Sequence, residues 1–288
     1  MATQQRAPQR VAVVTDSTSY LPVALSDALG VRLVALQVQL DGRTGQEGRD
    51  VSPADVTAAL RNRTAVTTSR PTPAEFLEVY RCALREGAEA VVSVHLSAEL
   101  SGTCDSARLA AAELDEGVVR VLDSRSTAMA LGFAVLAAAR AAAAGAGAEA
   151  VEQGARAARE RTSALFYVDS LEWLHRGGRI GTAAAMLGTA LAVKPLLHLA
   201  DGKIVPLEKV RTASKAIARL VQLTVNHAGS GEVDIAVQHL ASPERAADVA
   251  RQLREALPNL RELHQSEVGA VVGAHVGPGL LGVVVNRL

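Results

Sequence analysis

The chain has 288 residues, of which 49% are hydrophobic and 21% are charged, so it can bury sizeable cores and is not an intrinsically disordered chain. Basic and acidic residues number 30 each, and this balance excludes a strong overall field that would favour nucleic acid or an anionic membrane surface. The length exceeds that of a typical single domain, and we expect two domains.

Cysteine content and apolar stretches bear on the location of the protein. The two cysteines, Cys82 and Cys104, suit a reducing compartment better than a disulfide scaffold, and we expect a cytoplasmic protein. Residues 1–10 are polar and lack the apolar core of a signal peptide, so they predict a frayed leader. The longest apolar stretch, residues 128–148, is rich in alanine and interrupted by Arg140, which predicts a buried helix rather than a membrane span.

Short Val-rich runs alternate with helical patterns through the first half of the chain. Strands are predicted at residues 11–17, 31–40, 88–97 and 117–124, and helices at 21–30, 51–62, 72–87 and 104–114 and from residue 127 onward. Ser52 and Thr72 each precede a proline and are predicted helix caps. Strands separated by helices need crossover connections, which predicts a mainly parallel sheet covered on both faces.

The pattern changes after about residue 163. Strands are predicted at residues 163–170, 232–240, 260–268 and 279–288, and a hairpin at 194–210 turns at Asp201 and Gly202. Helices are predicted at 171–180, 214–225 and 242–257. Hairpin and crossover connections together predict a mixed sheet, so we expect an α/β protein with an N-terminal domain at residues 1–162 and a C-terminal domain at 163–288.

Three loops rich in hydroxyl groups are expected at strand ends, at residues 15–19, 67–73 and 97–103. In an open parallel sheet, ligands lie beyond the carboxyl ends of the strands, where hydroxyls and free N–H groups can hold an anion. Gly102 would let a ligand approach the backbone closely. The alternative is that these serines and threonines only cap helices and form turns, with Thr103 the expected cap of the helix that follows.

Other motifs are less informative. Residues 277–282 match G-x-G-x-x-G, but a predicted strand follows them instead of a helix, and the chain has no phosphate-binding P-loop. The seven histidines show no spacing typical of a metal site, so we expect no metal or other cofactor. His275 differs from the others because it lies in a predicted turn of small residues, where it could reach a ligand. Arg176, Arg179 and Lys194 lie near predicted element ends, where they could cap helices or contact a partner or a phosphate.

Eight pieces of the sequence occur in an order that matches one family: "VTDSTSYLP", "TTSRPTPAEF", "LSGTCDSA", "VLDSRSTAMALG", "LEWLHRGGRI", "KPLLHLADGKI", "KVRTASKAI" and "HVGPGLLG". On these pieces the chain resembles the DegV family of bacterial fatty-acid-binding proteins along almost its whole length. The resemblance implies two α/β domains, with a long-chain fatty acid buried in the first and its carboxylate near the interface. It also implies a carrier without catalytic residues of its own, which presents the acid to a separate, dihydroxyacetone-kinase-like fatty acid kinase for acyl phosphate formation.

The family motifs imply roles for nine residues of this chain. Thr68, Ser101 and His275 would hold the carboxylate, and Ser69 and Gly102 would line the same place. A second set would face the kinase: Arg176, Arg179, Lys194 and Arg211. We expect no nucleic acid partner, and transient contact with a membrane for lipid exchange.

The chain departs from the family pattern at two places, and two other functions stay open. Cys104 and Asp105 replace a Tyr-Gln pair, and Arg70 replaces a glutamine, which puts chain-length preference and the rim of the pocket in doubt. One alternative is an acyl-ester hydrolase with Ser101 or Ser97 as nucleophile and His275 or His95 as base. The other is a binding module for another small organic anion.

Overall fold

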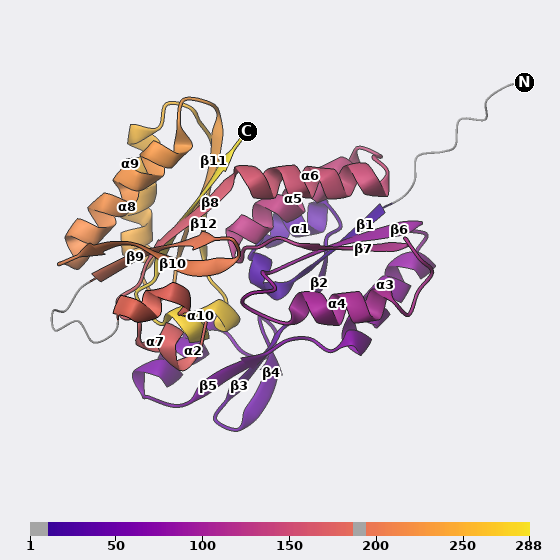
Figure 1. Ribbon diagram of the computed structural model, residues 1–288, viewed down its shortest axis with the longest axis horizontal. Coiled ribbons are helices and arrows are strands. Elements are labelled where there is room, and N and C mark those ends of the chain that lie inside the picture. The colour runs from indigo at the N-terminus through magenta and orange to yellow at the C-terminus, as the bar shows by residue number, and fades with distance from the viewer. Residues whose placement is uncertain (1–10, 187–193) are drawn as a thin grey trace, which may run out of the picture.

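The computed structural model describes residues 11–186 and 194–288, so the predicted leader at residues 1–10 lies outside the described residues. Three sheets organise the chain (Figure 1): a parallel sheet from the first half, a mixed sheet from the second half, and a small antiparallel sheet below them in that view. The predicted α/β class, with a parallel N-terminal and a mixed C-terminal sheet, is therefore confirmed.

The parallel sheet has the strand order β2-β1-β6-β7. Its strands are β1 (Val11–Asp16), β2 (Arg32–Val34), β6 (Ala90–His95) and β7 (Val119–Asp123). Helices α3 (Pro73–Arg85) and α4 (Thr103–Ala111) pack together on one face, and α5 (Met129–Ala143) and α6 (Ala148–Arg161) pack on the other. Because helices cover both faces, every residue of the central strand β6 is buried.

The mixed sheet has the strand order β10-β9-β8-β13-β11-β12, in which only β11 and β12 run parallel. Its strands are β8 (Thr162–Tyr167), β9 (Lys194–Ala200), β10 (Lys203–Val210), β11 (Val233–His239), β12 (Leu260–Glu267) and β13 (Leu281–Arg287). Helices α8 (Ala213–Ala228) and α9 (Pro243–Ala256) cover one face. The predicted hairpin is confirmed: Asp201 and Gly202 join β9 to β10 with positive φ angles of 51° and 80°, as a two-residue turn requires.

The small sheet was not predicted. The expected strand at residues 31–40 is two strands, because β2 joins the parallel sheet while β3 (Gln37–Leu40) pairs antiparallel with β4 (Arg43–Gln46) and β5 (Val66–Ser69). The apolar pattern of "VRLVALQVQL" runs through the break, so it gives no sign that the chain changes sheets at residues 35–36.

The helices also differ from prediction in places. The long helix expected from residue 127 is two helices, α5 and α6, separated by Gly145 at a φ of 83° and by Gly147. The N-cap of α4 is Gly102, and Thr103 is its first helical residue rather than its cap. The remaining helices are short: α1 (Val23–Ala28), α2 (Pro53–Arg61), α7 (Glu172–Arg176), α10 (Ala270–Val276) and the 3₁₀ turns η1 (Ser17–Ser19) and η2 (Gly181–Met186).

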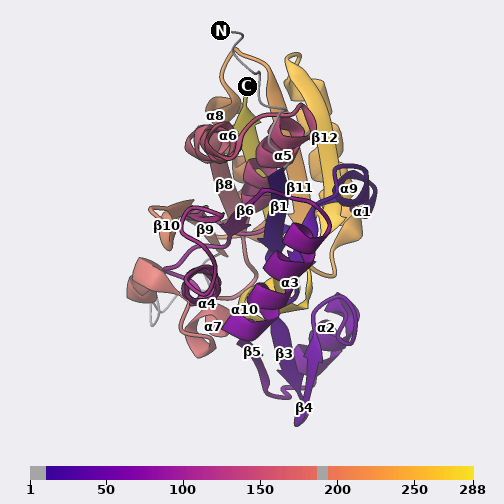
Figure 2. The same cartoon turned by 90° about the vertical axis from the view of Figure 1, so that its right-hand side faces the viewer.

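Helix α10 packs the C-terminal half of the chain against the N-terminal half. It comes from the C-terminal part of the sequence, yet it packs against α2, β3 and β5 (Figure 2). Its residues Ala270, Val271 and Ala274 belong to the same apolar core as Val38 and Val56 from the first half. The boundary at residues 162 and 163 stays a prediction, but the core of the first half is completed by residues beyond it.

Candidate functional site

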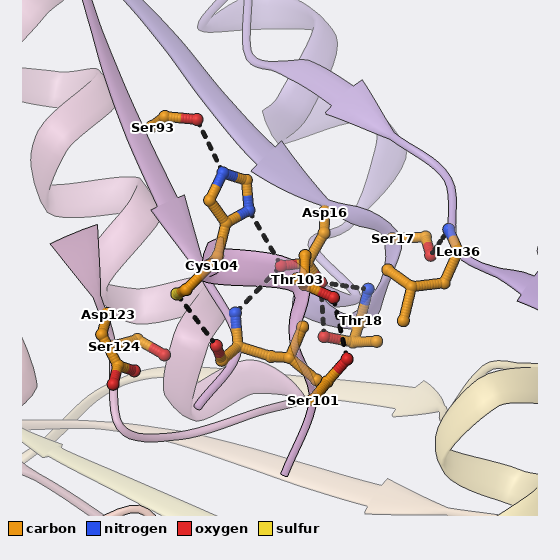
Figure 3. Close-up of polar contacts among 12 residues, drawn as sticks. Asp16, Ser17, Thr18, Leu36, Ser93, Ser101, Thr103, Cys104, Asp123 and Ser124 are labelled. Carbon is orange, nitrogen blue, oxygen red and sulfur yellow. Dashed lines mark hydrogen bonds and ion pairs between the residues drawn. The ribbon is translucent and has the colours of Figure 1, made fainter. Parts of the chain in front are cut away.

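The first predicted hydroxyl loop, residues 15–19, is buried within the protein and does not reach a ligand site. At the end of β1, Asp16 accepts hydrogen bonds from the Thr18 hydroxyl at 2.6 Å and from the backbone N–H of Leu96 at 2.9 Å (Figure 3). His95 Nδ1 lies 3.0 Å from the same carboxylate, and its Nε2 lies 2.6 Å from Ser93 Oγ. These polar groups are satisfied by one another and by the backbone, so Asp16 and Thr18 support the sheet rather than an anion. The hydroxyls of Thr15 and Ser19 are buried without a hydrogen-bond partner among the described residues.

The second predicted loop, residues 67–73, begins as strand β5 of the small antiparallel sheet, so the idea that it ends a parallel strand is wrong. Side chains alternate along a strand, and Thr68 therefore faces the opposite way from Thr67. Thr68 Oγ1 lies 2.8 Å from His275 Nε2. His275 itself lies on helix α10 and not in a turn, because the small residues before it form a helix that packs closely against α2.

His275 is a neutral hydrogen-bonding group at neutral pH. Burial lowers its pKa to about 4, and the positive charge of Arg179 contributes to the lowering. Its Nδ1 is buried without a hydrogen-bond partner among the described residues and lies so close to Gly177 that a Cβ there would come within 2.2 Å. The ring can therefore donate or accept a hydrogen bond through Nε2, but it carries little positive charge above about pH 5.

The third loop places Ser101 and Gly102 at the start of α4. The hydroxyl of Ser101 lies 2.9 Å from that of Thr103. The space beside Gly102 is taken by Arg70, because a Cβ on Gly102 would come within 1.9 Å of Arg70 Nη1. Gly102 thus makes room for the Arg70 guanidinium, whereas the sequence suggested room for a ligand head group.

An apolar cavity of about 960 Å³, including its opening to solvent, lies against the mixed sheet, with helix α10 and strand β5 of the small sheet also in its wall. Four of the predicted carboxylate-site residues are in its wall: Thr68, Ser69, Ser101 and His275. Gly102 is not in the wall, while Arg70 and Arg179 are. The apolar lining includes Leu36, Phe166, Leu174, Val271, Val283 and Val284. Most lining residues come from the second half of the chain, although the resemblance placed the lipid in the first.

The four predicted partner-facing cations do not share one environment. Arg179 lies at the cavity, where it donates to the carbonyl oxygens of Leu100 at 3.1 Å and Gly177 at 2.8 Å. Arg176 forms an ion pair with Glu172 on its own helix at 2.6 Å. Lys194 donates to Asp169, and Arg211 is exposed. Only Arg179 belongs to the cavity, and the role of the others at a partner surface stays a prediction.

Sequence reasoning missed two groups of site residues. The apolar residues that line the cavity have the same hydrophobic pattern as residues of a solid core, so the sequence carries no signal that distinguishes the two. Glu47 was missed as well: this buried carboxylate accepts a hydrogen bond from the N–H of Val271 at the start of α10. An acidic residue in a short polar turn is an ordinary surface pattern, and only the packing of α10 against it gives it a role.

Within residues 11–186 and 194–288, no three His, Cys, Asp or Glu side chains come together in a way that could hold a metal ion. No helix in these ranges combines the length and the apolar composition needed to cross a bilayer.

Comparisons with known proteins agree on one family. The family model described as "Uncharacterised protein, DegV family" matches residues 10–287. A DegV domain-containing protein from Streptomyces coelicolor is 54% identical over 278 residues, covering 96% of this chain and 99% of the relative. One from Mycobacterium tuberculosis is 44% identical over 277 residues, covering 96% and 97%.

Solved structures give the same result. A DegV family protein from Thermus thermophilus, described for its fatty acid binding, is 36% identical with a TM-score of 0.93 and covers 97% of this chain and 100% of its own. DegV from Bacillus subtilis, described as a fatty acid binding protein, is 34% identical with a TM-score of 0.88 over the same shares of the two chains. Sequence, fold and the order of motifs coincide over nearly the whole length, and the chain belongs to the DegV family.

Proposed function

We propose that this protein binds a long-chain fatty acid in the cavity against its mixed sheet, with the carboxylate at Thr68, Ser101 and His275. The observation that carries the proposal is that one apolar cavity has these three polar side chains in its wall. The fatty acid binding described for the Thermus thermophilus and Bacillus subtilis relatives supports the same ligand class.

The apolar wall accounts for affinity. A palmitate tail has about fifteen methylene or methyl carbons, and burying each contributes about 0.8 kcal/mol, or on the order of 12 kcal/mol before the cost of immobilising the ligand. The carboxylate adds little affinity, because it loses its hydration on entry and regains only what its hydrogen bonds supply. The tail therefore determines how tightly the acid binds, and the head group determines which way it points.

A cation would stabilise the charge of the carboxylate further, but His275 does not supply one at pH 7 because burial holds its pKa at about 4. Arg70 and Arg179 both line the cavity, and neither has a carboxylate partner within the described ranges. The hydrogen bonds of Arg179 go to carbonyl oxygens, which leave its charge uncompensated. We assign the hydroxyls and the imidazole to orientation of the head group, and the two guanidinium groups to its charge.

Mass spectrometry of the purified protein tests the proposal. Protein from a bacterial host should release a long-chain fatty acid on denaturing extraction, and delipidated protein should gain thermal stability with palmitate because a ligand of the native state shifts unfolding. Butyrate should give no comparable gain, since it lacks the tail. Protein that is purified without bound fatty acid and that binds none when it is added would contradict the proposal. Equal stabilisation by palmitate and butyrate would favour a binding module for another small organic anion.

The hydrolase alternative gains no support from the site. A serine hydrolase needs its nucleophile within hydrogen-bond reach of a base. Ser101 Oγ is paired with Thr103 Oγ1, and His275 Nε2 is paired with Thr68 Oγ1. Among the described residues neither histidine considered for the role is hydrogen-bonded to Ser101, since His95 is bonded to Asp16 and Ser93 and His275 to Thr68.

Arg70→Gln should weaken binding of palmitate about 2- to 5-fold and leave binding of the neutral 1-hexadecanol unchanged, because an exposed ion pair contributes up to about 1 kcal/mol. Gly102→Ala should have the same effect, since its Cβ would displace the Arg70 guanidinium. Titration calorimetry at low and high salt measures both, with Arg81→Gln on the exposed side of α3 as control. Equal losses for the acid and the alcohol would contradict a role in charge recognition.

We also propose that the protein delivers the bound acid to a separate fatty acid kinase. This delivery rests on the family resemblance, as do a partner surface with Arg176, Lys194 and Arg211 and transient membrane contact during lipid exchange. The proposed cytoplasmic location rests on the two cysteines. Formation of acyl phosphate from the loaded protein by such a kinase is the measurement that decides the delivery.

A further inference from the structure

A buried polar cluster of Ser17, Tyr20 and Glu47 lies against the first turn of α10. The carboxylate of Glu47 is 6% exposed and accepts hydrogen bonds from Ser17 Oγ, from the Tyr20 hydroxyl at 3.0 Å and from the backbone N–H of Val271 at 2.7 Å. Burial raises the pKa of Glu47, and these hydrogen bonds oppose that change. Asp16 is the other charged group acting on it, and its charge also raises the pKa.

The cluster supports the cavity wall at three places. Leu36 donates its backbone N–H to Ser17 Oγ at 3.0 Å and accepts from the N–H of Glu47 at 2.9 Å. The N–H of Val272 donates to the Tyr20 hydroxyl at 3.2 Å, beside the bond from Val271 to Glu47. Leu36, Val271 and Val272 all line the cavity. Every side chain of the cluster is thus bonded to the backbone of a wall residue.

Close packing holds the cluster against the start of the helix. A Cβ at Gly269 would come within 2.3 Å of Glu47 Oε1 and 2.5 Å of Tyr20 Cε1, so only glycine fits there. Tyr20 has a φ of 46°, which is costly for an aromatic residue and persists only where the surroundings determine it. Both features show that the position of the carboxylate relative to α10 is tightly determined.

We propose that Glu47, assisted by Tyr20, is a positioning residue for His275. Free N–H groups at a helix N-terminus need hydrogen-bond acceptors, and here the Glu47 side chain from the opposite half of the chain accepts from the N–H of Val271. His275 lies four residues after Val271, about one helical turn further on. Holding the first turn of α10 in place also holds His275 in place along the helix, so that its Nε2 stays within hydrogen-bond distance of Thr68 Oγ1. The inference rests on the proposed function, in which His275 contacts the carboxylate.

An NMR titration of the ligand-free protein tests this positioning directly. Wild-type His275 should stay neutral between about pH 5 and 8, because burial and Arg179 hold its pKa at about 4. In Glu47→Ala the first turn of α10 loses its acceptor, water reaches the ring, and the His275 pKa should rise toward 6.5. Tyr20→Phe removes the two hydrogen bonds of the Tyr20 hydroxyl but leaves the bond from Val271 to Glu47, and it should shift the His275 pKa less, in the same direction.

The matched control is Glu152→Ala. Glu152 is also largely covered and bonded, to Arg120 and Arg156, but it lies on α6 away from α10. This variant should lose stability without moving the His275 titration, which separates positioning from general destabilisation. In addition, Glu47→Ala and His275→Ala should weaken palmitate binding less than additively when combined, since one acts through the other.

A folded Glu47→Ala protein in which His275 still titrates near 4 overturns the proposal. If that variant does not fold, the Tyr20→Phe titration decides in its place, and an unchanged His275 pKa there overturns the proposal equally. Because the titration uses protein without lipid, a failure of fatty acid binding would leave its outcome intact and would count against the proposed function alone.

Discussion

Thr68→Val is expected to weaken binding of palmitate about 10- to 100-fold. The substitution keeps the shape of the side chain but removes the hydroxyl that lies 2.8 Å from His275 Nε2. A hydrogen bond to a charged group contributes about 1.5–3 kcal/mol, and the loss includes the partner left unsatisfied in a cavity wall. His275→Ala should cost a similar amount, and the double variant less than the sum, because the two side chains act as one unit.

Thr67→Val is the control for this prediction. Thr67 is the next residue along β5, is exposed, and donates to Gln39 Oε1 at 3.1 Å on the opposite side of the strand. Titration calorimetry should show unchanged binding for Thr67→Val. Wild-type affinity in Thr68→Val would mean that the carboxylate lies elsewhere in the cavity.

Asp16→Ala is expected to lower the free energy of unfolding by about 3–5 kcal/mol, as is typical when one partner of a buried, bonded group is removed. Asp16 is fully buried and accepts from His95 Nδ1, from the N–H of Leu96 and from both the N–H and the hydroxyl of Thr18. Alanine would leave these donors without an acceptor at the junction of β1 and β6. Urea unfolding measures the change as a lower midpoint.

Asp105→Ala gives the comparison on the surface. Asp105 is paired only with Arg108, three residues further along α4, and both side chains are largely exposed. Its removal should change stability by less than about 0.5 kcal/mol. If Asp16→Ala lowered the free energy of unfolding as little as Asp105→Ala, the buried hydrogen bonds at the end of β1 would not contribute to the stability of the sheet.

Local signals predicted most of the secondary structure. Thr72, Pro73 and Glu75 predict the start of α3, and the structure has the expected capping box at that position. Ser52 caps α2 in the same way, and Asp201 with Gly202 makes the expected hairpin turn. These predictions hold because a cap or a tight turn depends on atoms within four residues of each other, which the sequence specifies directly.

Predictions failed where a residue's environment comes from distant segments. The break between β2 and β3 depends on which sheet edge each strand meets, and nothing in residues 31–40 records this. His275 was expected in a turn because Gly273, Gly277 and Gly279 surround it and glycine disfavours a helix, but packing of α10 against α2 outweighs that preference. The loop at residues 15–19 was expected to bind an anion, but it is buried and its Asp16 is bonded to Leu96 and His95. These partners lie about 80 positions away, so the sequence of the loop does not reveal them.

By itself, the sequence determined the α/β class, the ordered motifs of the DegV family and the residue types able to hold a carboxylate. Only the tertiary structure decided which of them share a site, because Thr68 and His275 are 207 positions apart and meet through the packing of α10 on the small sheet. It also showed that the space beside Gly102 holds Arg70 rather than a ligand, and that Glu47, to which the sequence assigned no role, accepts a hydrogen bond at the start of α10. A motif specifies chemistry locally, whereas burial and the pKa of a side chain depend on everything packed around it.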